Sequence, residues 1–322
     1  RDNAGNFIVI GTHEIAQFRH ISLRDLWRVH AIPDRTYACS GLAVWGRATA
    51  DGRLIHTRNL DWTIEVGIQR HAAVLVVHPA GKHAFVNVGW AGFIGALTGI
   101  NDRRISIGQI GAETADMTSA GLPMTFLMRR VLEEADDLEE AVRLIREAPR
   151  TVGVNYVVSD ANAKRAVVIE TTRSHVAVFE ADDVTEHGVA YARPLTDAVF
   201  RADTAVDAAI RDRQLASGGN PRAPGLEPPT GSAYEVRYLG QSAGILAHYG
   251  RIDVETAKEI AKAVAPRSNV QSVIFAWPEL WVANAEGLTP AAHTTYHQLD
   301  LPTLFDTIQN PKSKIQNSVT PQ

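Results

Sequence analysis

The sequence predicts a layered α+β fold in which antiparallel sheets are covered by helices. Three observations lead to this prediction. Short runs rich in β-branched residues recur through the middle of the chain, turn residues join several of them directly, and helical patterns come in separate blocks. The strict alternation of strand and helix that is typical of a doubly wound parallel sheet is missing from the sequence.

The composition excludes several classes of function. Hydrophobic residues make up 45% of the 322 residues and charged residues 21%, which is ordinary for a protein with a substantial core. The net charge of −4 gives no support to a nucleic-acid partner, and no apolar run approaches the roughly 20 residues of a membrane span. The single cysteine, Cys39, excludes a disulfide framework and any multi-cysteine metal site. We therefore expect no cofactor and no metal, while a homo-oligomer remains compatible with the sequence.

The first predicted elements are two strands over residues 36–49 and 54–62, joined by a tight turn at Asp51-Gly52. Further strands are predicted over shorter runs bounded by Gly, Asp or Asn. Two pairs of these runs form predicted hairpins, one within 154–170 and one around Pro278-Glu279. The runs lie at 74–77, 84–88, 104–107, 154–159, 166–170, 176–180, 273–277 and 280–283.

Apolar residues at helical spacing predict helices between these groups of strands. Asp137 and Asp253 are the expected N-caps of two of them. The predicted helices span 22–29, 122–133, 138–147, 202–216, 234–249 and 254–264. A Gly- and Pro-rich loop is expected at 217–231, and the polar tail at 306–322 is expected to be disordered.

The first hairpin places three reactive side-chain types on adjacent strands. It carries Cys39 on one strand and returns Arg58 and Asp61 beside it on the other. A thiol, a cation and a carboxylate together can form a nucleophilic site. A small buried thiol next to an incidental ion pair explains the same residues equally well, so local chemistry leaves both interpretations open.

The run from Cys39 through Asp51-Gly52 to Arg58-Asn59-Leu60-Asp61 resembles the N-terminal-nucleophile (Ntn) cysteine hydrolases. Within them it is most similar to the penicillin acyltransferase family, which is related to choloylglycine hydrolases, penicillin V acylases and acid ceramidase. Downstream, Asn155 resembles the family's oxyanion-hole asparagine. Arg237, in the segment 232–237, resembles a further active-site arginine.

The resemblance implies a four-layer αββα sandwich that is made as an inactive precursor. Cleavage between Ala38 and Cys39 would expose Cys39 as a new N-terminus. Residues 1–38 would then be a pro-segment or a short retained subunit, 39–305 the catalytic domain and 306–322 a tail. The expected partner is a small N-acyl amide or acyl-thioester substrate.

These residue types suit acyl transfer through a thioester. A free α-amine titrates at about 7.7–8.0 and can take the proton of the Cys39 thiol, so no histidine is required. Arg58 would stabilise the thiolate, and Asp61 would orient the α-ammonium group. Asn155 would donate to the oxyanion, and Arg237 would bind a substrate carboxylate or brace the site.

Two other functions remain open at this stage. Ser242 lies in a Gly-x-Ser-x-Gly pattern, so an α/β-hydrolase would use it with Asp253 and either His293 or His297. The other alternative is a non-catalytic binding protein of the same fold, in which Cys39 is never exposed. The sequence does not separate hydrolase from transferase, nor does it name the acyl and amine groups.

The compartment also stays open. The chain begins at Arg1 and its three methionines are internal. Removal of a signal segment, which would imply a periplasmic or secreted protein, is compatible with this start. A cytoplasmic location is compatible with it too.

Overall fold

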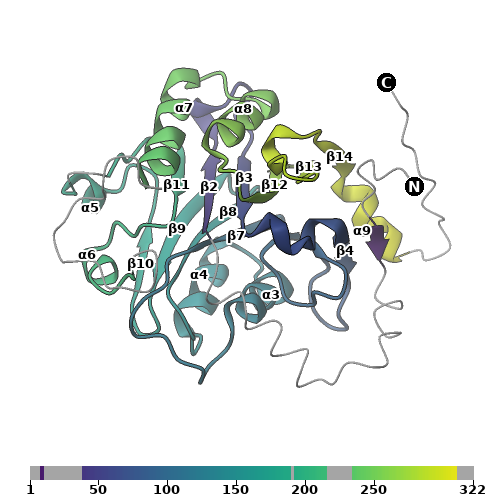
Figure 1. Ribbon diagram of the computed structural model, residues 1–322, viewed down its shortest axis with the longest axis horizontal. Coiled ribbons are helices and arrows are strands. Elements are labelled where there is room, and N and C mark those ends of the chain that lie inside the picture. The colour runs from purple at the N-terminus through teal and green to yellow at the C-terminus, as the bar shows by residue number, and fades with distance from the viewer. Residues whose placement is uncertain (1–7, 11–37, 190–191, 216–233, 310–322) are drawn as a thin grey trace.

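The computed structural model describes residues 8–10, 38–189, 192–215 and 234–309. Two β-sheets lie face to face, and helices cover the outer face of each (Figure 1). Helices α3 and α4 cover the larger sheet, whereas α7 and α8 cover the smaller one. These helices span Met124–Glu134, Leu138–Glu147, Gly240–His248 and Val254–Val264. The predicted α+β fold with four αββα layers is confirmed.

The larger sheet has eight strands in the order β1-β4-β5-β6-β7-β8-β9-β10. Every pair is antiparallel except β1 with β4, which run parallel. Because β1 precedes Cys39, the segment before this cysteine contributes an edge strand to the sheet. In sheet order the strands are Ile8–Ile10, Ala72–Val77, Phe85–Trp90, Thr98–Asn101, Ile105–Gly111, Val154–Asp160, Arg165–Thr171 and Val176–Phe179.

The smaller sheet has six antiparallel strands in the order β11-β2-β3-β12-β13-β14. The predicted hairpin β2–β3 forms part of its centre, with Cys39 opposite Leu60. Its connection, however, is longer than the predicted tight turn, because a 3₁₀ helix, η2, lies between the strands. In sheet order the strands are Ala198–Arg201, Ala38–Val44, Ile55–Asp61, Asn269–Ala276, Glu279–Asn284 and His297–Asp300; η2 spans Gly46–Ala48.

Side chains of β3 alternate between the two faces of the smaller sheet. His56 and Arg58 point between the sheets and contact residues of the larger sheet. Asn59, in contrast, donates to a carbonyl of α8 in the outer layer. The Cys39 side chain packs with Leu60 in the core cluster that spans both sheets. The candidate nucleophile therefore lies in the interior, between the two sheets.

Both predicted N-caps are present. Asp137 accepts from the backbone nitrogen of Glu140 at 2.8 Å, and Asp253 from that of Thr256 at 2.8 Å. The predicted helix at 22–29 and the predicted loop at 217–231 lie outside the described residues. Short helices and terminal elements complete the fold: η3 Ile64–Val66, η4 Ile68–His71, α5 Val184–His187, α6 Ala208–Arg211, η5 Tyr234–Leu239, η6 Ala291–His293 and α9 Leu301–Gln309.

The predicted helix over 202–216 is wrong. Of its described residues, 202–215, only Ala208–Arg211 are α-helical, and those before them form an irregular segment after β11. Buried side chains from other elements bind the backbone of that segment, which overrides its helical composition. At the other end of the chain, α9 continues to Gln309, inside the stretch expected to be a tail.

No helix among the residues placed by the structure is both long and apolar enough to cross a membrane.

Candidate active site

Cys39 lies near the start of β2 and is fully buried. The hairpin register brings Arg58 next to it, and Arg58 Nη2 donates to Cys39 Sγ at 3.2 Å. Arg58 is itself held by the carbonyl oxygen of Gln109 on β7, which accepts from Nε and Nη2 at 3.2 Å each. The side-chain amide of Gln109 lies 3.7 Å from the same sulfur. A guanidinium is thus fixed against the thiol by both sheets.

Gly108 on β7 makes room for this arginine. A Cβ atom at Gly108 would lie 2.6 Å from Cγ of Arg58, closer than real Cβ contacts allow. The stem of Arg58 therefore passes between the sheets only because residue 108 has no side chain. The sequence carries no signal of this requirement, because it depends on which strands face one another.

Asp61 is buried, and each of its carboxylate oxygens has a side-chain partner. Arg237, from η5, forms an ion pair with Asp61 Oδ2 at 2.9 Å. Asn269, on the neighbouring strand β12, donates to Asp61 Oδ1 at 3.0 Å. Arg237 thus belongs to the same cluster as Cys39 and Asp61, and its described contacts fit the expected bracing role.

Asp203 is a site residue that the sequence did not reveal. Its Oδ1 accepts from the backbone nitrogen of Cys39 at 2.7 Å, and its Oδ2 pairs with Arg237 at 2.8 Å. Asp203 lies in the segment 202–216 that was predicted to be an ordinary helix. Nothing in its local sequence marks it, because its contact with Cys39 joins residues 164 positions apart.

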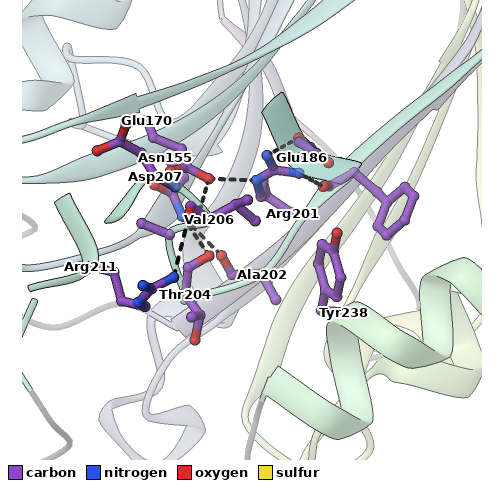
Figure 2. A network of polar contacts seen from close by, with 12 residues as sticks. Asn155, Glu170, Glu186, Arg201, Ala202, Thr204, Val206, Asp207, Arg211 and Tyr238 are labelled. Carbon is purple, nitrogen blue, oxygen red and sulfur yellow. Dashed lines mark hydrogen bonds and ion pairs between the residues drawn. The ribbon is translucent and has the colours of Figure 1, made fainter. Parts of the chain in front are cut away.

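Asn155 lies on β8, and its described hydrogen bonds go to the backbone on either side of Asp203 rather than to the Cys39 sulfur. Its Nδ2 donates to the carbonyl oxygens of Ala202 and Thr204 at 3.1 and 3.4 Å. Figure 2 shows this amide directed at the segment that carries Asp203. Asn155 therefore positions Asp203, and its role as an oxyanion donor stays a prediction.

Burial and charge oppose each other in this cluster. Burial raises the pKa of the Cys39 thiol to about 11, although Arg58 and the backbone N–H of Asp61 act against this rise. Burial also raises the pKa of Asp61 to about 7, with Arg237 opposing the shift and Asp203 adding to it. In the intact chain the thiol therefore keeps its proton at neutral pH, and Asp61 titrates close to neutrality. A nucleophilic thiol at this position needs a base.

The structure does not support the alternative in which Ser242 is the nucleophile. Ser242 lies inside helix α7 and follows the π-helical segment η5, whereas a nucleophile elbow requires a strand and a sharp turn before the helix. The two glycines of the pattern serve helix packing instead. Cβ atoms at Gly240 and Gly244 would lie 2.8 and 2.9 Å from side-chain atoms of α8.

The residues that would complete a catalytic triad with Ser242 are accounted for elsewhere in the fold. Asp253 caps α8 through its contact with Thr256. His297 lies in β14, at the opposite edge of the smaller sheet from β11, and His293 lies in η6, which packs against β12 and β13. Within the described ranges, no group of three or more His, Cys, Asp or Glu residues is arranged to hold a metal ion.

Comparison with known proteins agrees with the geometry. Residues 47–189 match the family of acyl-coenzyme A:6-aminopenicillanic acid acyl-transferase. The penicillin V acylase structure from Agrobacterium tumefaciens superimposes with a TM-score of 0.54 at 13% identity, over 83% of this chain and 87% of that one. The chain has the Ntn-hydrolase fold. The predicted resemblance to the penicillin acyltransferase family is confirmed as well.

Two curated relatives share part of the sequence. Protein dcd1B of Dictyostelium discoideum is 30% identical over 164 residues, which are 50% of this chain and 33% of that protein. N-acylethanolamine-hydrolyzing acid amidase of Rattus norvegicus is 23% identical over 201 residues, 60% of this chain and 52% of the amidase. The chain thus spans a third to about half of their lengths.

These partial similarities are the basis for proposing an Ntn-type amide hydrolase or acyltransferase. The matched family region contains Arg58, Asp61 and Asn155. It does not reach Cys39, Asp203 or Arg237, so the case for these three residues rests on the geometry of the site.

Proposed function

We propose that this protein is an autoprocessed cysteine amidohydrolase or acyltransferase in which Cys39 is the nucleophile. One observation carries the proposal: Arg58 donates to the Cys39 sulfur at 3.2 Å while Asp203 accepts from the nitrogen of the same residue at 2.7 Å. Sulfur and nitrogen of one residue are thus held by groups of opposite charge. This arrangement suits a thiol nucleophile whose own nitrogen becomes its base.

The first reaction would be cleavage of the chain itself. The Cys39 sulfur attacks the carbonyl carbon of Ala38, and the thiol proton passes to the nitrogen of Cys39. The peptide C–N bond then breaks, so that the acyl group has moved from nitrogen to sulfur. Water then hydrolyses this thioester, which releases the carboxyl group of Ala38 and the thiol. The nitrogen of Cys39 becomes a free α-amine, still beside Asp203 and near the buried pair Asp61–Arg237.

The second reaction would use this amine. It takes the thiol proton, and the sulfur attacks the carbonyl of an N-acyl amide. The C–N bond of the substrate breaks, and the proton passes to the leaving amine. Water resolves the resulting thioester in a hydrolase, and a second amine resolves it in an acyltransferase. We propose small N-acyl amides or acyl thioesters as substrates, in keeping with the name of the mammalian relative.

The parallel pairing of β1 with β4 supports retention of the fragment 1–38 after cleavage. A fragment that contributes a strand to the sheet stays bound by backbone hydrogen bonds when the covalent link is lost.

Intact mass spectrometry of the wild-type protein and of Cys39→Ala tests the proposal. The wild type is expected to give two fragments that separate at Ala38/Cys39, and the variant a single chain. A panel of N-acyl amides with different acyl chains and amines is then assayed with both proteins, and only the cleaved wild type is expected to turn any of them over.

Ser242→Ala is the matched control for the alternative nucleophile. It is expected to be cleaved and as active as the wild type, because Ser242 lies in a packed helix. A wild-type chain that stays intact and inert would refute the proposal and leave the binding protein as the explanation. Loss of activity in Ser242→Ala alone would instead revive the serine mechanism.

A further inference from the structure

The nitrogen of Cys39 is the start of a continuous chain of polar contacts. It donates to Asp203 Oδ1 at 2.7 Å, and Asp203 Oδ2 pairs with Arg237 Nη1 at 2.8 Å. The same nitrogen of Arg237 pairs with Asp61 Oδ2 at 2.9 Å. Two carboxylates are therefore linked through one guanidinium, and one of them holds the atom that is to become the amine.

The backbone around Asp203 is fixed by buried side chains from three other elements and from its own segment. Gln214 donates to the carbonyl oxygen of Asp203 at 3.0 Å and accepts from the nitrogen of Ala205 at 2.8 Å. Asn155 binds the carbonyl oxygens on either side, as Figure 2 shows. On the two flanks, Gln241 binds the carbonyl of Arg201, and Glu170 binds the nitrogens of Val206 and Asp207.

Such a set of contacts holds the carboxylate of Asp203 in place before any reaction begins. A group that only filled space at the surface would not need side chains from three strands or helices and from the segment itself to fix its backbone. This preorganisation is characteristic of a group whose position matters for the chemistry of its neighbour.

We infer that Asp203 is a positioning residue that holds the nitrogen of Cys39 before cleavage and acts as the counter-ion of its α-ammonium group afterwards. This inference rests on the function proposed above and adds a second carboxylate, besides Asp61, that acts on the amine. Before cleavage Asp203 needs only an oxygen that accepts from a neutral N–H. After cleavage its negative charge determines the pH range in which the amine is free to act as a base.

The sign of the effect follows from the charges that face the amine. The groups around it are the carboxylates of Asp61 and Asp203, the guanidinium groups of Arg58 and Arg237, and the Cys39 thiol itself. A carboxylate within hydrogen-bond distance stabilises the ammonium form and raises the pKa of the amine. Removal of the Asp203 charge leaves Asp61, whose own pKa is about 7, against two guanidinium groups, so the amine loses its proton at lower pH.

The test compares Asp203→Asn and Asp203→Glu with the wild type. Cleavage is followed by intact mass, folding by circular dichroism, and kcat/KM by hydrolysis of an N-acyl 4-nitroanilide across a range of pH. In Asp203→Asn the amide oxygen can still accept from the N–H of Cys39, so the chain is expected to be cleaved. In this variant, the apparent pKa that governs the rise of kcat/KM on the acidic side of the pH profile (the acidic limb) is expected to fall by roughly one pH unit or more. Asp203→Glu keeps the charge, and its limb is expected within about half a unit of the wild type.

Asp137→Asn is the matched control. It makes the same chemical change at the exposed N-cap of α4, where asparagine caps as well as aspartate, and it is expected to leave the pH profile unchanged. A wild-type chain that stays uncut refutes the proposed function and this inference with it. A cleaved Asp203→Asn with an unchanged acidic limb overturns the inference alone.

The remaining outcomes are also decisive. A folded but uncut Asp203→Asn overturns the inference, because the oxygen should suffice before cleavage. If Asp203→Asn does not fold, Asp203→Glu decides: a limb displaced by a full unit or more, with the charge retained, contradicts a role as counter-ion.

Discussion

Two buried clusters of charged residues share the segment 201–207, and they are built in different ways. In the first, Arg201 donates to Glu170 at 2.6 Å and also to Glu186 (Figure 2). The aromatic rings of Phe179 and Tyr238 lie against its guanidinium. Glu170 also accepts from two backbone nitrogens at 2.7 and 2.8 Å. In the second, around Cys39, two carboxylates share the single guanidinium of Arg237.

The difference shows in the protonation of each cluster. Burial alone would lower the pKa of Arg201, but Glu170 and Glu186 outweigh it and raise that pKa, so the cation is permanent. Around Cys39, burial raises the pKa of Asp61 to about 7 and that of the thiol to about 11. In the first cluster Arg201 keeps its charge, while burial raises the pKa of Glu170 against the opposing effects of Arg201 and two backbone N–H groups. The second places groups where protons can move near neutral pH, as sites of proton transfer require.

The comparison predicts its largest effect for Arg201→Met. Loss of the cation leaves Glu170 and Glu186 buried without their partner, and breaking such a cluster costs about 3–5 kcal/mol of unfolding free energy. Urea unfolding measures the change. Arg165→Met is the control, because it removes an exposed arginine that also pairs with two glutamates. It is expected to cost about 1 kcal/mol or less, and equal losses in the two variants would contradict the distinction.

Arg58→Met is expected to lose little stability and much activity. Its described hydrogen bonds go to a carbonyl and a thiol rather than to carboxylates, so the loss of stability should be smaller than for Arg201→Met. Loss of the charged donor to sulfur should lower kcat by about 100-fold, the usual order for one preorganised donor. Urea unfolding and turnover of the best N-acyl amide measure the two effects. A variant that loses stability but keeps its activity would show that Arg58 is structural.

The smallest predicted effect is a pH dependence of stability that comes from Asp61. Its pKa of about 7 lies above the ordinary 3.8, so the folded chain keeps a proton there that the unfolded chain releases. The stability that comes from this proton is therefore lost as the pH rises from about 4 to about 7. In a Cys39→Ala background, which keeps the chain in one covalent form, Asp61→Asn removes this loss.

Thermal unfolding of the two proteins checks this prediction. The advantage in Tm of Asp61→Asn over its parent is expected to be larger at about pH 8 than at about pH 5, by about 2 °C or more. A difference in Tm that is constant across this range would mean that Asp61 is ionised throughout.

Helix predictions show how far local patterns reach. The helices capped by Asp137 and Asp253 begin where the sequence indicates, because an N-cap and an apolar stripe are local features. The helix expected at 202–216 fails for the opposite reason. Its backbone groups are bound by Asn155, Glu170 and Gln214, and such contacts cannot be read from helical spacing.

The sequence by itself determined that Cys39 lies on one strand of a hairpin and that Arg58 and Asp61 lie on the other, because neighbouring runs of β-branched residues joined by turn residues form adjacent strands. It also determined the class of fold, through the separation of strands and helices along the chain. Only the tertiary structure decided that Gly108 opens the path of Arg58 and that Asp203 holds the nitrogen of Cys39. Both contacts depend on how the second sheet and the segment after β11 pack against the hairpin, and that packing joins residues far apart in the chain.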